Sequence, residues 1–122
     1  MSTITTLLQS YSHGQRDFSG LSLANVNLSC ADLKGADLSY SDLSNIDLSQ
    51  ANLRGVDLSY ATLNQVDLHH ADLRGAMLIG TDLRDASLAE ANLQDADYIP
   101  GATRFPVEFD PQQAQMHSVQ PE

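Results

Sequence analysis

Tryptophan is absent from this sequence of 122 residues, and aromatic residues make up only 6% of it. Because large aromatic side chains usually dominate a conventional globular core, this shortage predicts that something more repetitive supplies the buried surface. There is also a single cysteine, Cys30. It cannot form an intramolecular disulfide, and no cysteine or histidine lies near it at a metal-binding spacing. We therefore expect Cys30 to be a surface thiol.

Basic residues are scarce as well. Six lysines and arginines stand against 16 aspartates and glutamates, which gives a net charge of −10 at pH 7. Phosphate backbones and anionic lipids bind clustered positive charge, so this balance disfavours direct binding to nucleic acid or to a membrane surface. No apolar run approaches the ~18 residues that a membrane span needs, and the segment MSTITTLLQSYSHGQ lacks the basic start and long apolar stretch of an export signal. The sequence predicts one small domain in the cytosol.

What the sequence does have is a repeat of five residues. A large apolar residue recurs at every fifth position without a slip in register. The residues at this central position are Phe18, Leu23, Leu28, Leu33, Leu38, Leu43, Leu48, Leu53, Leu58, Leu63, Leu68, Leu73, Leu78, Leu83, Leu88, Leu93 and Tyr98. Two positions before the centre lies a small or β-branched residue, and one position before it lies most often aspartate or asparagine. The unit is Ala-(Asp/Asn)-Leu-x-x, as in ADLKG, ADLSY and ANLRG.

A period of five fits neither the 3.6-residue turn of an α-helix nor the two-residue alternation of a long strand. The chain must therefore turn at every repeat. If each unit forms one side and each corner turns the chain by roughly a right angle, four units close a square coil whose central residues point to one axis. Coils stacked at the ~4.8 Å spacing of paired strands would give a rod of about four coils and about 20 Å.

These units resemble those of the pentapeptide-repeat family, and the resemblance covers residues 16–100 without a gap. It implies an all-β fold, the right-handed quadrilateral β-helix, which is a β-solenoid. The flanking segments LLQSYSHGQRDFSG and TRFPVEFDP also resemble the N-terminal cap and the C-terminal segment of small cyanobacterial members. Such a match is specific for the fold and says little about function.

Open ends of a solenoid expose apolar surface and unpaired backbone, so we expect caps at both ends. Residues 1–15 are predicted to form a capping α-helix, with Ser2 or Thr3 as its N-cap and Gly14 at its end. Its apolar face would consist of Ile4, Leu7, Leu8 and Tyr11, which follow the spacing of one helix face. Residues 16–100 would then form the solenoid.

The C-terminal part, residues 101–122, is predicted to be a short cap followed by a loose tail. The repeat stops where this part begins, and Phe105 and Phe109 offer apolar cover for the end of the core. An Asp-Pro pair at residues 110 and 111 has the chemistry of a helix start, which predicts a short helix over residues 111–116. Residues 117–122 are expected to be loose.

Because the central residues form the core, any binding specificity must lie on the four outer faces, where residues 20 positions apart stack in columns. The first face carries aspartates in its column and no basic side chain at its outer positions. We expect Asp37, Tyr40, Asp57 and Tyr60 to form the candidate partner surface, because tyrosine supplies contact area and a hydroxyl at low entropic cost. The alternative is structural: the aspartates bind corner amides, and the tyrosines merely cover the corner.

The fourth face differs, because it carries a column of basic side chains. Lys34, Arg54 and Arg74 run beside a column that contains Asp32 and Asp72. Opposite charges in parallel columns cancel most of the repulsion within each column. We interpret this face as self-neutralised and structural.

Two further groups of residues are interpreted as structural. His69 and His70 are adjacent on the third face, where outward side chains diverge around a corner, so we expect solvated histidines and no metal site. His13 and His117 lie in the predicted caps without evident partners. Met77, Ile79 and Ile99 are apolar where other coils carry aspartate or serine. Either the C-terminal tail folds over them, which we favour, or they form an exposed apolar patch.

No constellation for catalysis is present: there is no serine or cysteine with a plausible histidine base and no glycine-rich phosphate loop. The sequence therefore predicts a non-catalytic protein-interaction or scaffold module, without cofactor or metal, that acts as a monomer on a protein partner. The alternative follows from the resemblance, because some family members mimic B-DNA and bind type II topoisomerases. The net charge of −10 favours an acidic DNA mimic. A length of about 20 Å, roughly six base pairs, opposes it.

Overall fold

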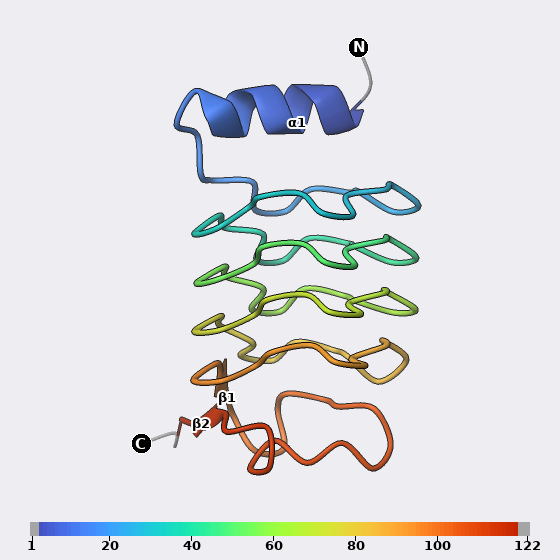
Figure 1. The fold of residues 1–122 in the computed structure, drawn as a ribbon, viewed down its shortest axis with the longest axis vertical. Coiled ribbons are helices and arrows are strands. Elements are labelled where there is room, and N and C mark those ends of the chain that lie inside the picture. Colours follow the sequence, from blue (N-terminus) through green and yellow to red (C-terminus); the bar gives the residue numbers. More distant parts are fainter. Residues whose placement is uncertain (1–2, 120–122) are drawn as a thin grey trace.

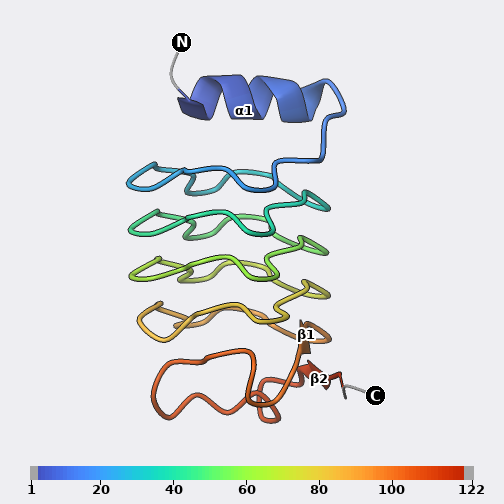
Figure 2. The ribbon, with the colours of Figure 1, turned by 180° about the vertical axis from the view of Figure 1, so that it is seen from behind.

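The computed structural model describes residues 3–119 and shows one helix lying across the end of a stack of irregular coils (Figure 1). The helix, α1, covers Thr3–Ser12. Two short strands, β1 (Asp97–Tyr98) and β2 (His117–Ser118), pair in parallel near the other end of the stack. The view from behind shows the same stacked coils on the opposite side of the molecule (Figure 2). In the described part of the chain, no helix is long and apolar enough to cross a membrane.

Single parallel bridges, rather than long strands, hold neighbouring coils together. Each bridge joins the residue before a centre to the residue 20 positions later, as in Asp37 with Asp57, except for the last bridge between Asp82 and Arg104. The N–H of Asp57 donates to the carbonyl of Ala36 in the preceding coil at 3.0 Å. The 20-residue coil predicted from the repeat is therefore confirmed, and its backbone polar groups are satisfied by the coils on either side.

Each side of a coil ends in a tight turn. At one corner the N–H of Ala61 donates to the carbonyl of Leu58 at 3.0 Å, and Tyr60 between them has a φ of 60°. A positive φ at the third position is the geometry of a type II turn. The same left-handed φ recurs at every fifth residue from Gly20 to Asp95, with Asp85 as the one exception. The turn that the period of five requires is thus built into the backbone at a fixed phase.

The central residues form one continuous core. Several leucines in the middle of the ladder have no exposed surface; they are Leu33, Leu43, Leu48, Leu53, Leu58, Leu63 and Leu68. Burying each leucine side chain is worth about 1.5–3 kcal/mol, and each coil repeats the contacts of the one before. The predicted core is confirmed.

Helix α1 turns its apolar face to the first coil. Leu7 is 5% exposed, and the other three apolar residues predicted for this face are partly buried against the core. The helix ends in a Schellman motif: Gln15 N–H donates to the carbonyl of Ser10, Gly14 N–H donates to the carbonyl of Tyr11, and Gly14 has a φ of 98°. The described helix begins at Thr3, and Ser2, the other predicted N-cap, lies outside the described residues.

The prediction that the repeat stops at residue 101 is wrong, because it resumes after an insertion of two residues. Arg104 bridges Asp82, 22 positions earlier, and the N–H of Leu83 donates to the carbonyl of Arg104 at 2.7 Å. Thr103 is buried, and its hydroxyl donates to the carbonyl of Leu78 at 2.6 Å. Phe105 follows Arg104 as a central residue follows the bridged residue in the other units, although the next turn runs from Pro106 to Phe109 and so lies one residue later than in those units. The insertion hides this unit from a search with a strict period of five.

The helix predicted over residues 111–116 is replaced by a run of turns at 111–115. The expected N-cap hydrogen bond is present, since Asp110 Oδ1 accepts the N–H of Gln112 at 2.9 Å. However, the N–H of Met116 donates to the carbonyl of Pro111 at 3.0 Å, and the chain then enters β2. Pairing with the preceding coil prevents a regular helix from forming here.

The tail is also less free than predicted. His117 N–H donates to the carbonyl of Ala96 and Val119 N–H to that of Tyr98, both at 2.8 Å, so residues 117–119 are not loose. The remainder of the predicted tail, residues 120–122, lies outside the described residues.

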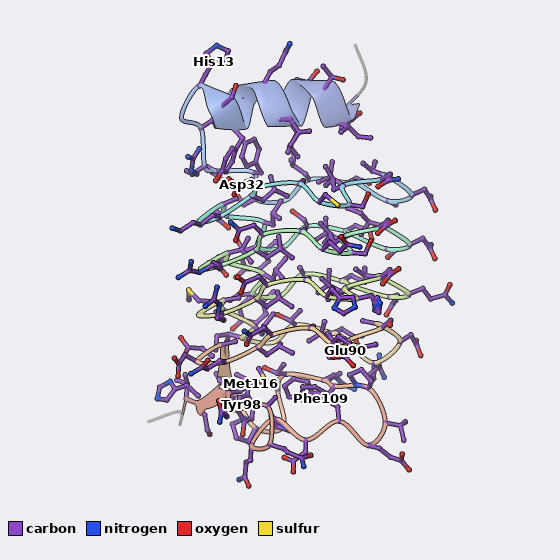
Figure 3. All side chains as sticks on the ribbon, viewed as in Figure 1. His13, Asp32, Glu90, Tyr98, Phe109 and Met116 are labelled. Atoms are coloured by element: carbon purple, nitrogen blue, oxygen red, sulfur yellow. The ribbon has the colours of Figure 1, made fainter. Side chains whose placement is uncertain are left out.

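Three aromatic rings pack against one another at the C-terminal end of the core. Phe105 lies edge-on to Tyr98 with ring centroids 5.6 Å apart, and Phe109 stacks on Phe105 at 5.0 Å. Figure 3 shows Tyr98, Phe109 and Met116 at this end of the stack, opposite His13 beside α1. Of the three apolar residues expected to lie beneath the tail, Met77 remains 41% exposed, so the predicted cover is absent there, whereas Ile79 and Ile99 are half-buried. The phenylalanines pack on the end of the core instead of its outer face.

Candidate protein-interaction surface

The candidate surface predicted from the sequence consists of Asp37, Tyr40, Asp57 and Tyr60, and we refer to it as the first-face surface. Asp37 and Asp57 are bridge partners in successive coils. The rings of Tyr40 and Tyr60 stack with centroids 5.1 Å apart and planes 19° from parallel. The 20-residue coil therefore brings all four side chains to one side of the rod.

The aspartates hold their own corners with one carboxylate oxygen. Asp37 Oδ1 accepts the N–H of Ser39 at 2.9 Å and the hydroxyl of Ser39 at 2.6 Å, and Asp57 Oδ1 accepts the N–H of Ser59 at 2.9 Å. This is an Asx turn, which explains why aspartate and asparagine dominate the position before the centre. No hydrogen bond to Oδ2 of either residue is found within residues 3–119. The structural interpretation thus holds for one oxygen of each carboxylate, and the other accepts no hydrogen bond from residues 3–119.

One unsatisfied polar atom lies between Asp57 and Tyr60 of the first-face surface, on Ser59. The hydroxyl oxygen of Ser59 is buried and has no hydrogen-bond partner in the described part of the chain, and Ser59 itself is 7% exposed. In the preceding coil the equivalent Ser39 hydroxyl donates to Asp37. Sequence inspection could not distinguish these two serines, because both occupy the same place in the same unit, DLSY.

The tyrosines of the first-face surface are the most exposed aromatic residues of the coils. Tyr40 is 68% exposed and Tyr60 is 54% exposed. Both occupy left-handed corners, which cost an ordinary side chain about 1–2 kcal/mol relative to the right-handed region. Rings at such corners project from the rod instead of packing into it. They supply contact area that the fold itself does not use.

Serine hydrogen bonds lower the pKa of several aspartates around the rod. The hydroxyl and N–H of Ser44 stabilise the charged form of Asp42 and lower its pKa below 3.8, and Ser49 does the same for Asp47. Ser19 lowers the pKa of Asp17 in the same way. These carboxylates are therefore fully charged at neutral pH.

The fourth face is neutralised only in part. Arg74 forms a two-pronged ion pair with Asp72 (Nε to Oδ1 2.9 Å, Nη2 to Oδ2 2.7 Å), and this contact lowers the pKa of Asp72. Lys34 and Arg54 form no ion pair with any described residue. The charge of Arg54 also lowers the pKa of Asp72 without an ion pair, so the prediction of a self-neutralised face holds around Asp72, and Lys34 contributes no ion pair among the described residues.

The histidines and the cysteine occupy structural or solvent positions. The prediction that His69 and His70 diverge is wrong, because their rings meet edge to face with centroids 4.0 Å apart. His117, predicted to have no partner, contacts Asp97 Oδ1 through Nδ1 at 2.9 Å. Within the described residues, no group of three or more His, Cys, Asp or Glu side chains could hold a metal ion. Cys30 is exposed, as predicted.

Solved structures place this fold among known ones. The pentapeptide repeat protein alr5209 from Nostoc PCC 7120 shares 48% sequence identity with the chain over 98% of both proteins, with a TM-score of 0.94. The pentapeptide repeat protein Rfr23 from the cyanobacterium Cyanothece 51142 shares 23% identity over 94% of this chain and 95% of that one, with a TM-score of 0.60, and so supports the fold alone. A comparison with curated proteins gave no match.

The sequence pattern of the family described as pentapeptide repeats matches the chain in eight copies, at residues 17–55, 31–69 and 67–97. Proteins of this family form right-handed quadrilateral β-helices, which confirms the fold class predicted from the repeat. They are typically structural or interaction modules. The repeat, the ladder of coils and the match to alr5209 together show that this chain belongs to the pentapeptide-repeat family.

Proposed function

We propose that the protein is a non-catalytic interaction module that presents the first-face surface to a partner protein. The observation that carries this proposal is the stacked, exposed pair of Tyr40 and Tyr60 beside two carboxylates that each keep one oxygen without a hydrogen bond from residues 3–119. Exposed aromatic residues with nearby charge are the common anchors of protein interfaces. The partner is therefore expected to carry basic and planar groups.

The rod serves as the support for this surface. We propose a solenoid of about four coils, closed at one end by α1 and at the other by residues 101–119, that works as a monomer in the cytosol. Leu7 packed on the first coil and Phe105 packed on Tyr98 support the two caps, because each covers apolar surface that an open solenoid would expose.

Affinity purification from the native organism tests the proposal. We would compare the wild type with a variant that carries Asp37→Asn, Tyr40→Asn, Asp57→Asn and Tyr60→Asn. Asparagine suits positions 40 and 60, because Asn25 and Asn45 hold the same left-handed conformation at other corners. It suits positions 37 and 57, because Oδ1 of Asn27 and of Asn52 accepts the same turn N–H in other units. A protein retained by the wild type and lost by the variant supports the proposal.

A matched control alters the fourth face by Lys34→Gln and Arg54→Gln, which should leave the partner bound. Circular dichroism of both variants shows whether each still folds. Loss of the partner from the fourth-face variant, with retention by the first-face variant, would place the interaction elsewhere and overturn the proposal.

Mimicry of DNA is the second candidate, and the net charge of −10 favours it. Lys34 and Arg54 on the fourth face, which form no ion pair with any described residue, interrupt the negative surface that a duplex would present on all sides. Inhibition of gyrase supercoiling by the wild type, lost with Asp37→Asn and Asp57→Asn, would support mimicry over the interaction module.

A further inference from the structure

One corner of the rod carries a column of four residues with an unusual pattern. Gly20, Tyr40, Tyr60 and Gly80 lie 20 positions apart, and all four are left-handed, with φ between 60° and 69°. They therefore occupy the same place in successive coils, with two rings between two glycines.

The rings in this column lean toward the C-terminal end. A Cβ atom built on Gly80 would lie 2.6 Å from both Cδ1 and Cε1 of Tyr60, so the Tyr60 ring covers that glycine. Tyr40 in turn stacks on Tyr60. A third ring, stacked on the face of Tyr40 that points away from Tyr60, would have to come from a side chain at residue 20.

Residue 20 supplies no ring there, because it is glycine. A Cβ built on Gly20 would have no heavy atom of the described chain within 4 Å apart from its own neighbours, as at the glycine corners of residues 35, 55 and 75, so the position faces solvent. Tyr40, at the N-terminal end of the ring stack, is more exposed than Tyr60, at 68% against 54%. We call this open position the Gly20 slot.

Two carboxylates belong to the same sides of the coils as Gly20 and Tyr40. Asp17 and Asp37 come three residues before Gly20 and Tyr40 in their coils and are bridge partners. Each binds its serine through Oδ1. The nearest basic residue in the chain, Arg16, is engaged elsewhere: its guanidinium lies 3.7 Å from the centre of the Tyr11 ring and donates to the carbonyls of Tyr11 and Gln15.

We propose that the Gly20 slot receives an arginine side chain of the partner protein. A guanidinium is planar, so it can extend the stack on Tyr40, and its five donors can reach the carboxylates at the same time. A lysine could use the charge but not the stack, and an aromatic side chain could use the stack but not the charge. This inference rests on the proposed function, because it assumes that the first-face surface binds a protein.

The chain offers a variant that fills the slot without disturbing the fold. Gly20→Tyr would place a third ring on Tyr40, in a conformation that Tyr40 and Tyr60 already adopt. We would follow the Tyr40 ring and the Gly20 N–H by NMR while adding N-acetyl-argininamide, with N-acetyl-lysinamide and N-acetyl-citrullinamide as probes that lack the planar shape or the charge. The Tyr40→Asn variant removes the platform.

The expected result is a saturable shift of the Tyr40 ring and Gly20 N–H signals with the arginine probe in the wild type. The shifts should be smaller with both other probes, and the Tyr40 ring should no longer respond in Gly20→Tyr. Equal responses to the arginine and lysine probes, or an unchanged Tyr40 response in Gly20→Tyr, would overturn the inference.

The same variant separates this inference from the proposed function. If the partner binds the wild type, is lost from the four-residue first-face variant and is retained by Gly20→Tyr, the surface is used and the arginine slot is wrong. If the partner is lost from Gly20→Tyr as well, and an arginine of the partner is required for binding, both hold.

Discussion

The ring of Tyr60 lies where a side chain at Gly80 would begin, since a Cβ at residue 80 would be 2.6 Å from two ring carbons. Gly80 is therefore required for space as well as for its φ of 66°. The contact fixes the direction in which the tyrosines lean, and so determines which face of Tyr40 is open.

Gly80→Ala should consequently destabilise the rod more than Gly20→Ala. Both changes put a side chain on a left-handed corner, at about 1–2 kcal/mol each, but only the first displaces the Tyr60 ring from its stack with Tyr40. Such stacking is worth about 0.5–1.5 kcal/mol. Urea unfolding measures the difference. In a Tyr60→Asn background the two alanine variants should become equally stable, and a persisting difference would show that the ring is not the cause.

Leu58→Asp should unfold the solenoid. Leu58 is fully buried in the middle of the leucine ladder, with no group nearby to pair with a charge, so the variant must bury a carboxylate or expose the core. We expect loss of the native circular dichroism signal and of the cooperative thermal transition. Ala89→Asp provides the control, because Ala89 is exposed on the outside of a coil and should tolerate the charge. A Leu58→Asp protein with native melting behaviour would contradict the core described above.

Acid should weaken the fold through the aspartate–serine contacts. Because the pKa values of Asp42 and Asp47 are lowered below 3.8 in the folded protein, their charged forms stabilise it at neutral pH. This stabilisation is present above the unfolded-state pKa and is lost as the pH falls through the lowered, folded-state pKa. Ser44→Ala with Ser49→Ala should therefore reduce the melting temperature at pH 7, and the difference from the wild type should shrink in strong acid.

The control for the acid experiment is Ser29→Ala. This change keeps the N–H of Ser29, which donates to Oδ1 of Asn27, and Asn27 cannot ionise, so the effect of the variant on stability should not depend on pH in this way. A difference between wild type and the Ser44/Ser49 variant that stays constant down to the lowest pH would argue against the assigned cause of the pKa shifts.

Leu7→Asp should release α1 from the first coil. Leu7 is 5% exposed and is the most deeply buried residue of the helix, so a carboxylate there opposes docking. The uncovered end of the solenoid would then expose apolar side chains and associate with other copies. Size-exclusion chromatography with light scattering should show oligomers for Leu7→Asp. Gln9→Asp, on the exposed side of α1, should leave the particle mass unchanged, and a monomeric Leu7→Asp protein would show that the helix is not needed as a cap.

The core could be predicted from the sequence because one physical requirement repeats at a fixed interval. Leu58 is central for the same reason as Leu53 and Leu63, so any error at one position would have broken the register of the others. The apolar face of α1 follows a second period, that of the helix. Where these periods apply, prediction and structure agree.

The last coil could not be predicted, because two extra residues before Thr103 move Phe105 out of the fifth-residue register. The pairing of β2 was missed for another reason: it depends on backbone groups of His117 and Val119, which no side-chain pattern marks. At the candidate surface, the sequence places Tyr40 and Tyr60 in one column, but the lean of the rings follows from contact with Gly80. A glycine on either side of two tyrosines, at intervals of 20 residues, was the signal available for it.

The 20-residue interval between bridged residues also constrains how such a gene can lengthen. A tandem duplication of 20 codons in the middle of the repeat would add one layer, about 4.8 Å thick, and leave every column in phase. A duplication of five codons would keep the leucines buried but rotate everything beyond it by a quarter turn about the rod. Tyr40 and Tyr60 would then leave their common corner if the insertion fell between them. The buried core can therefore be extended by single five-residue units. A binding surface that runs across several coils is kept only when whole 20-residue coils are added.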